Sequence, residues 1–159
     1  MTGPAITSNL QELTQDLEML KERLPDMLDE TIHEIGNYGY ASAQSRVAVK
    51  SGNLRLRSGC DNSKRFMSTI FYNAPYAPHV ENGTGIYGPS GAPFVIEAKS
   101  KKALRWTDAG GIAHFAKRVT IQGMPPRPFL RPGVEDAKLH AEEISGAVFD
   151  RYMKEAMGR

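Results

Sequence analysis

The run from Gly83 to Gly88 has the spacing of the Gly-x-Gly-x-x-Gly fingerprint that binds dinucleotides. That fingerprint functions only between a buried strand and a helix, because the N-terminus of the helix holds the pyrophosphate. Here prolines lie on both sides, with Pro78 before the run and Pro89 directly after it. Since no helix can begin at Gly88, the glycines predict turns and not a nucleotide site.

Other residues with catalytic or ligand chemistry lack partners at the required spacing. The run around Ser90 lacks the second glycine of a nucleophile elbow, because Ala92 stands in its place. The segment Glu30–His33 is one Glu-x-x-His unit, whereas a carboxylate-bridged metal pair needs two. The other histidines lie in separate segments, and one cysteine allows no disulfide framework and no thiolate zinc cluster. The sequence therefore predicts no enzyme, no cofactor and no metal site.

The length of 159 residues, with 40% hydrophobic and 24% charged residues, fits one soluble globular domain. No apolar run approaches the roughly 18 residues of a membrane span, and the first residues predict no secretory signal. The net charge of +2 hides a separation of acidic and basic residues along the chain. Residues 1–43 have 8 acidic and 2 basic residues, residues 44–132 have 4 and 14, and residues 133–159 have 6 and 4. This pattern predicts either a basic surface for an outside partner or acidic helices packed on a basic sheet.

Leucines from Leu10 to Leu24 recur in steps of three and four residues, which predicts an amphipathic helix. Ser8 or Asn9 would cap its start, and Pro25 would kink it without ending the stripe. The helical region is predicted over residues 9–48, behind a flexible arm at 1–8. Such a narrow stripe is either core or a packing surface for a neighbouring subunit.

The middle of the chain alternates with period two, which predicts an antiparallel sheet of about four strands within residues 60–122. The short connections between the later strands predict a meander. The expected strands are 66–72, 94–99, 104–107 and 112–121. A Gly/Pro-rich loop at 74–93 and a Pro-rich arm at 123–133 are both expected to be extended, and a helix is predicted over 134–158. The fold class is α+β, with both helices packed on the sheet in a single domain, 1–159.

The basic middle segment also fits a nucleic-acid-binding module, since Tyr72, Tyr76 and Trp106 are interleaved with its cations. No recognition helix, zinc finger or aromatic sheet motif accompanies these residues. The candidate DNA-facing residues are Lys99, Lys101, Lys102, Lys117 and Arg118.

Three stretches of the chain, taken together and in their order, resemble the motifs of one protein family. Residues 51–58 read Ser-Gly-Asn-Leu-Arg-Leu-Arg-Ser, residues 76–84 read Tyr-Ala-Pro-His-Val-Glu-Asn-Gly-Thr, and residues 126–133 read Pro-Arg-Pro-Phe-Leu-Arg-Pro-Gly. In this order they resemble the head-tail joining or tail-completion proteins of long-tailed bacteriophages, of the Hong Kong ninety-seven type. The chain departs from the family at Ser51, where threonine is usual, and at Gly133, where alanine is commoner. The likeness spans most of the chain.

The resemblance implies a structural virion protein that catalyses no reaction. Its subunits would form a ring, expected to be a hexamer, at the neck between the head connector or stopper and the tail terminator or tail tube proteins. The ring would line the DNA passage, with transient nonspecific contact with genome DNA, and would be made in the host cytoplasm and located in the virion. A tail terminator ring is the alternative within the same class. The implied interface residues are Tyr76, Glu81, Gly83, Thr84, Arg127, Phe129, Leu130 and Arg131.

The last of these motifs also has a physical interpretation without the family. Phe129 and Leu130 on a proline-stiffened arm can enter an apolar slot, and Arg131 suits a bidentate carboxylate pair. The slot would lie on the same subunit or on a neighbour, and the sequence leaves both alternatives open.

Overall fold

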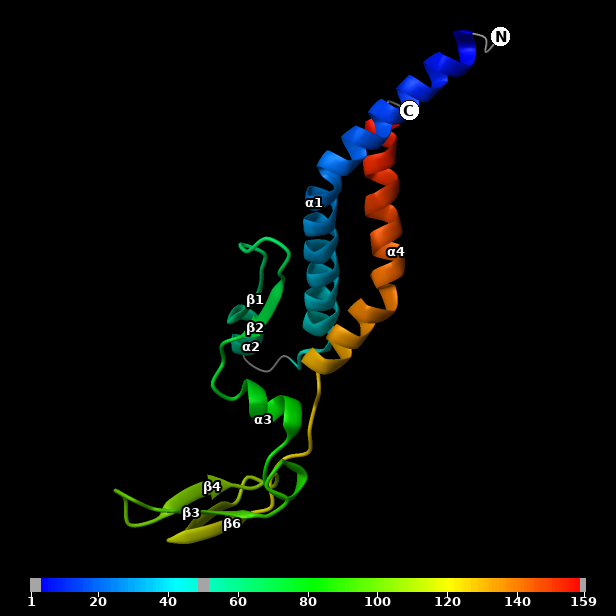
Figure 1. Ribbon diagram of the computed structural model, residues 1–159. Helices are drawn as coiled ribbons and strands as arrows, with labels where there is room; N and C mark the ends of the chain where they lie inside the picture. The colour runs from blue at the N-terminus through cyan, green and yellow to red at the C-terminus, as the bar shows by residue number, and fades with distance from the viewer. Residues whose placement is uncertain (1–3, 49–51, 158–159) are drawn as a thin grey trace. The chain divides into compact units, whose positions relative to one another are not determined.

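The computed structural model describes residues 4–48 and 52–157 (Figure 1). It confirms the predicted α+β class, with long N- and C-terminal helices and antiparallel strands. The chain forms two compact units: unit 1 comprises residues 1–73 and 129–159, and unit 2 comprises residues 74–128. The prediction of a single domain over the whole chain stays a prediction. The predicted cap at residues 8–9, the turn at residues 50–53 and the helix end at residue 158 lie wholly or partly outside the described side chains.

Each unit contains helices and strands. The elements of unit 1 are α1 (Pro4–Arg46), α2 (Asn53–Leu56), β1 (Ser58–Asp61), β2 (Thr69–Tyr72) and α4 (Leu130–Met157). Those of unit 2 are α3 (Ala77–Asn82), a 3₁₀ helix (Gly85–Tyr87), β3 (Phe94–Glu97), β4 (Leu104–Thr107), β5 (Ala113–Ala116) and β6 (Arg118–Ile121).

Both long helices begin earlier in the chain than predicted. α1 begins at Pro4, inside the arm predicted over residues 1–8, and α4 begins at Leu130, inside the predicted extended arm. In both cases a proline lies in the first turn, where the amide that it lacks would have no partner in the helix. Pro25 lies inside α1, and Figure 1 shows α1 changing direction between its dark blue first turns and its cyan last turns.

The core of unit 1 lies between α1 and α4, which run antiparallel along each other (Figure 1). Near the end of α4, Glu155 forms an ion pair with Arg23 of α1 at 3.0 Å. Near its start, a Cβ at Gly133 would lie only 2.7 Å from the Cβ of Ala43. This close approach leaves no room for a side chain at position 133 unless the helices move apart. The buried apolar residues of unit 1 are Ala43, Val47, Leu54, Phe129, Ala137 and Val148.

Asp136 ties the start of α4 to the last turns of α1. Its carboxylate accepts a hydrogen bond from the Ser42 hydroxyl at 2.5 Å and lies 2.7 Å from Nη2 of Arg46. The Ser42 hydroxyl, and after it the Arg46 guanidinium, lower the pKa of the Asp136 carboxyl from its ordinary value of 3.8. A carboxyl whose pKa is lower in the folded chain stabilises that chain above its unfolded pKa. The contribution disappears as the pH falls through the folded pKa.

We therefore expect Asp136→Asn to lower the free energy of unfolding at neutral pH. The difference from the native protein should shrink as the pH falls from about 5 to about 2, because the native carboxyl then becomes protonated as well. Urea unfolding followed by circular dichroism at several pH values measures this difference. A difference that stays the same at every pH would contradict the proposed role of the charge.

The strands in the described residues pair as three two-stranded antiparallel sheets, not as one sheet of about four strands. β1 pairs with β2, β4 with β5 and β3 with β6. The predicted meander is wrong because β3 does not pair with β4, its neighbour in sequence. Period-two alternation shows which side chains share a face, but it does not identify the partner strand. β1 was not predicted, since Ser-Gly-Cys-Asp has little intrinsic preference for a strand.

The strands of unit 2 form one long hairpin, residues 94–121, which we call the basic hairpin. β5 and β6 follow each other with only Lys117 between them, and they pair with β4 and β3 respectively. The ladder continues past β3, because the amide of Ala98 donates to the carbonyl of Lys117 at 3.0 Å. The chain then leaves the ladder and returns to it at Leu104. We call this excursion, residues 99–103, the basic loop.

The segment 74–93 was predicted to be extended, and this prediction is wrong for part of it. It contains α3 and the 3₁₀ helix, and Pro78 lies in the first turn of α3, where proline is tolerated. Residues 122–128, in contrast, have neither helix nor strand, as predicted for the Pro-rich arm.

Candidate interaction surfaces

The predicted interface residues divide between the two units. Tyr76, Glu81, Gly83, Thr84 and Arg127 lie in unit 2, whereas Phe129, Leu130 and Arg131 lie in unit 1. Whether these residues form one interface stays a prediction.

Two of the three motifs contact each other inside unit 2, where the Gly-rich loop pairs with the Pro-rich arm. The amide of Thr84 donates to the carbonyl of Met124 at 2.9 Å, and the amide of Met124 donates to the Thr84 hydroxyl oxygen at 3.0 Å. Farther along the arm, the amide of Arg127 donates to the carbonyl of Val80 at 2.8 Å. These bonds give the motif residues a structural role in holding the base of the basic hairpin.

The pairing brings backbone against backbone at two glycines. A Cβ at Gly85 would lie 2.1 Å from the carbonyl oxygen of Gln122, and one at Gly123 would lie 1.9 Å from that of Thr84. Both glycines have positive φ, +63° and +108°. No other residue type fits at this crossing, because real Cβ atoms do not approach backbone so closely. The fingerprint-like glycines are therefore required by packing within the chain.

Phe129 is a core residue of its own chain. Its side chain is 2% exposed, and its ring meets the Tyr72 ring edge-on, with the centroids 4.7 Å apart. The slot that the sequence left open thus lies on the same subunit for Phe129. Leu130, the next residue, is half-buried and lines an apolar hollow of about 590 Å³ between α1, α4 and the segment before β2.

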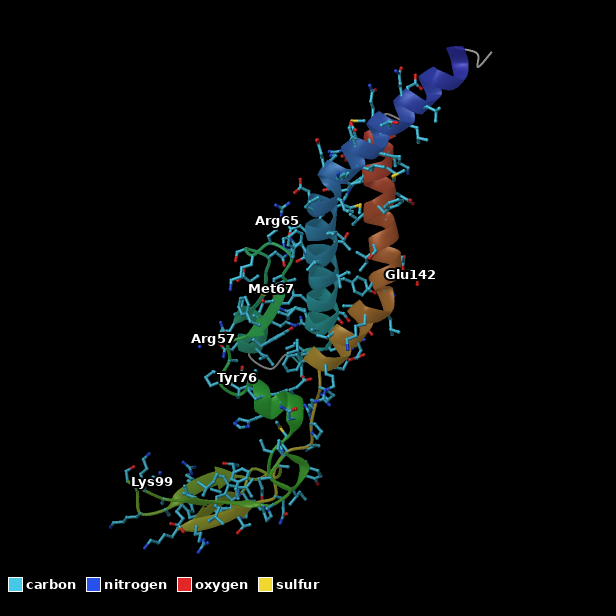
Figure 2. The ribbon with its side chains drawn as sticks, in the orientation of Figure 1. Arg57, Arg65, Met67, Tyr76, Lys99 and Glu142 are labelled. Atoms are coloured by element: carbon cyan, nitrogen blue, oxygen red, sulfur yellow. The ribbon has the colours of Figure 1, made fainter. Side chains whose placement is uncertain are left out.

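The rim of this hollow carries a strained residue. Phe66 has a φ of +58°, in the left-handed region that aromatic residues rarely adopt, and half of its side chain is exposed. Its amide donates to a carboxylate oxygen of Asp29 at 2.6 Å, and the neighbouring Arg65 forms an ion pair with Asp26 of α1. In Figure 2, Arg65 and Met67 mark this segment beside α1. The contacts with α1 hold the segment in place.

The candidate DNA-facing residues are all exposed on the basic hairpin. Lys99, Lys101 and Lys102 lie on the basic loop, where Figure 2 shows Lys99 at its outer end. Lys117 lies between β5 and β6, and Arg118 begins β6 and forms an ion pair with Glu97 at 3.4 Å. The structure thus places these five cations on one hairpin, on the basic loop and at the junction of β5 with β6.

The hairpin carries an apolar groove that the sequence did not reveal. The groove has a volume of about 350 Å³. Its lining residues are Ile96, Leu104, Arg105, Trp106, Val119 and Ile121. The period-two alternation predicted which of these residues share a face of their strand. Only the pairing of β3 with β6 and of β4 with β5 brings the faces together.

Asp108 closes the turn between β4 and β5. Its carboxylate accepts hydrogen bonds from the amides of Gly110 and Ile112, each at 2.9 Å, and contacts Nε2 of His114 at 2.8 Å. The His114 contact, followed by these amides, lowers the pKa of the Asp108 carboxyl. The His114 ring stacks on Trp106, with centroids 5.4 Å apart. This arrangement stabilises the turn and places no nucleophile beside a base.

The N-terminal half of the leucine stripe is exposed. Leu10, Leu13 and Leu17 are 58%, 51% and 57% exposed, whereas α4 ends close to where its Glu155 meets Arg23. Of the two interpretations of the stripe, packing in the core of unit 1 is wrong for these three leucines. We call residues 10–22 of α1 the leucine segment.

In residues 4–48 and 52–157, no helix is both long and apolar enough to cross a membrane. Within the same ranges, no three His, Cys, Asp or Glu residues gather as ligands for a metal ion.

No family model matches the chain. No curated protein matches it, and no solved structure does.

Proposed function

We propose that the chain is a structural subunit of a homo-oligomeric ring at the head-tail junction of a tailed bacteriophage. The ring would join the head connector or stopper to the tail terminator or tail tube, and its channel would pass the genome DNA. The proposed role is structural and includes no catalysed reaction. The motifs at residues 76–84 and 126–133, which resemble those of head-tail joining proteins, supply the class, and the exposed surface of the chain supports association.

The observation that carries the proposal is the size of the accessible surface. The chain exposes 11586 Å². A compact monomer of 17.5 kDa would expose about 7,900 Å², and two separate compact bodies with the sizes of units 1 and 2 about 9,400 Å². The excess is about 2,000 Å² even against the larger figure. A ring subunit has two contacts, and each buries about 800 Å² of its surface in an interface of ordinary size.

Many large apolar side chains of the described residues are exposed, which favours association. Large apolar side chains are exposed on both long helices and on the basic hairpin, including Leu17, Phe149 and Phe115. Where such side chains gather into one patch, they mark a surface that associates. A ring of identical subunits covers them with head-to-tail contacts, for which each subunit needs two different surfaces that match.

The basic hairpin is the part that we assign to the DNA passage. The three lysines of the basic loop are exposed, and lysines attract phosphates without reading a base sequence. Contact of this kind lets DNA slide past, which a passage requires. The tail terminator alternative predicts the same ring and differs only in its neighbours.

The proposal is tested by native mass measurement of the purified chain across a concentration series, at low and moderate salt. We expect a discrete oligomer, above all a hexamer, seen as rings by electron microscopy. Capture of purified tails or of heads with their connector would then identify the neighbours. A chain that remains a 17.5 kDa monomer at every concentration, and that captures neither, would contradict the proposal.

The five exposed cations on one hairpin also support a second function, a nucleic-acid-binding module. Such a module would bind DNA as a monomer, with an affinity that falls steeply as salt is raised. A joining ring would show self-association and only weak, nonspecific DNA binding. Measuring DNA affinity at two salt concentrations on the same samples separates these two functions.

A further inference from the structure

The leucine segment has an apolar face whose first leucines are exposed in the part of unit 1 that the structure describes. It extends past the end of α4, because Arg23 already contacts Glu155 and the Tyr152 ring near the last turns of that helix. Leu10, Leu13 and Leu17 are each more than half exposed. Since an isolated helix of this length is marginal in water, the segment needs an apolar surface to stabilise it.

The basic hairpin, for its part, needs an element that packs on its apolar groove. β3 with β6 and β4 with β5 form two-stranded sheets, which are marginally stable unless they pack on a helix or on further strands. Ile96, Val119 and Ile121 line the groove beside Trp106, and Trp106 and Ile96 are both about two-fifths exposed. A helix laid on a sheet buries the apolar face of both, which is a standard layer arrangement of folded proteins.

The charges favour this pairing over two alternatives. The leucine segment carries four acidic residues and one lysine, a net charge of −3, and the basic hairpin carries six basic and two acidic residues, a net charge of +4. Helix on hairpin therefore joins opposite charges. A pair of leucine segments or a pair of hairpins would bring like charges together, which costs free energy. The acidic residues are Glu12, Asp16, Glu18 and Glu22.

We propose that the leucine segment of one copy docks into the groove of the basic hairpin of the next copy. The leucines fill the groove, and the basic loop lies beside the acidic residues of the helix. This inference rests on the proposed ring, because a second copy in head-to-tail contact supplies a helix to one neighbour and a hairpin to the other. It names the two matching surfaces that the ring requires.

The test uses two variants of the full chain, each with one surface altered. The helix variant carries Leu13→Asp and Leu17→Asp, and the hairpin variant carries Lys99→Glu, Lys101→Glu and Lys102→Glu. All five residues are exposed, so both variants should fold, which far-UV circular dichroism and Trp106 fluorescence verify. Each variant alone should need a concentration at least about tenfold higher than the native chain to associate.

Mixing the two variants gives the decisive result. The helix variant keeps its hairpin and the hairpin variant keeps its leucine segment, so one good contact remains for each unlike pair. We expect native mass measurement to show a complex of one copy of each and no larger ring. Adding Glu12→Lys and Glu18→Lys to the hairpin variant should restore its association, because the charges are then exchanged. Leu139→Asp on α4, an exposed residue outside both surfaces, is the control and should assemble like the native chain.

Several outcomes would overturn the inference. A hairpin variant that associates like the native chain, beside a helix variant that does not, would show that the leucine segment contacts a surface other than the basic hairpin. Folded variants that form no mixed complex would place the contact elsewhere or within one chain. If the native chain forms rings while both variants assemble normally, the docking fails and the proposed function stands. A native chain that is monomeric throughout overturns both.

Discussion

Replacing Phe129 with alanine is expected to lower the free energy of unfolding by about 3–5 kcal/mol, the usual cost of removing a fully buried phenylalanine. The Phe129 side chain is 2% exposed and packs edge-on against Tyr72. It lies directly before α4, so the cavity left behind would loosen the attachment of that helix. Urea unfolding followed by the helical circular dichroism signal measures the change, with an unchanged dependence on urea concentration as a check on two-state behaviour.

Phe149→Ala is the matched control for this prediction. Phe149 lies on α4 in the same unit and is 47% exposed, so its truncation removes much less buried surface. Measured at a concentration where the chain is monomeric, it should cost far less than Phe129→Ala. Equal effects of the two substitutions, or a Phe129→Ala protein that loses assembly without losing stability, would show that Phe129 acts at a subunit interface instead.

The helices were predictable because their signal is local. The leucine repeat and the later stripe at helical spacing required no knowledge of distant residues, and both helices are present. The start of α4 was missed because Pro132 was taken as part of an extended arm, whereas proline is compatible with the first turn of a helix. The start of α1 was missed because a cap was expected at Ser8 or Asn9, whereas α1 begins at Pro4.

The pairing of the strands was not predictable in the same way. The alternation in residues 94–121 correctly placed strands near β3, β4 and the β5–β6 pair, and the turn at Asp108 was expected. A connection of a few residues between β3 and β4 fits a tight turn as well as an excursion from the ladder. The choice depends on contacts with β6, which lies farther along the chain, so the groove remained hidden.

The candidate site shows the same limit. The proline neighbours of glycines 83, 85 and 88 predicted turns there, and the structure has a 3₁₀ helix at Gly85–Tyr87. The partner of these glycines could not be found, because the residues that cross them are Gln122 to Met124, which have no pattern of their own. The burial of Phe129 against Tyr72 likewise depends on two residues that are far apart in sequence.

The glycine crossing leads to the second large effect, which is expected for Gly123→Ala. An alanine Cβ would lie 1.9 Å from the Thr84 carbonyl oxygen and 2.5 Å from its carbon, at a φ of +108°. The backbone must move apart, and the hydrogen bonds between Thr84 and Met124 would be lost with it. Strain and overpacking together should cost about 2–6 kcal/mol. Trp106 is the one tryptophan of the chain and lies on the hairpin, so its fluorescence reports the unfolding of unit 2.

Gly91→Ala separates the steric clash from the backbone strain. Gly91 lies in the same unit with a φ of +60°, but nothing lies within 4 Å of the Cβ that alanine would add. This substitution should cost only the strain of a left-handed alanine, about 1–2 kcal/mol. The Trp106 transition should therefore shift much more for Gly123→Ala than for Gly91→Ala. If the two shifts are equal, the close crossing of the Gly-rich loop and the Pro-rich arm does not hold the base of the hairpin. The need for glycine at positions 85 and 123 would then have to come from a surface that contacts a neighbouring subunit.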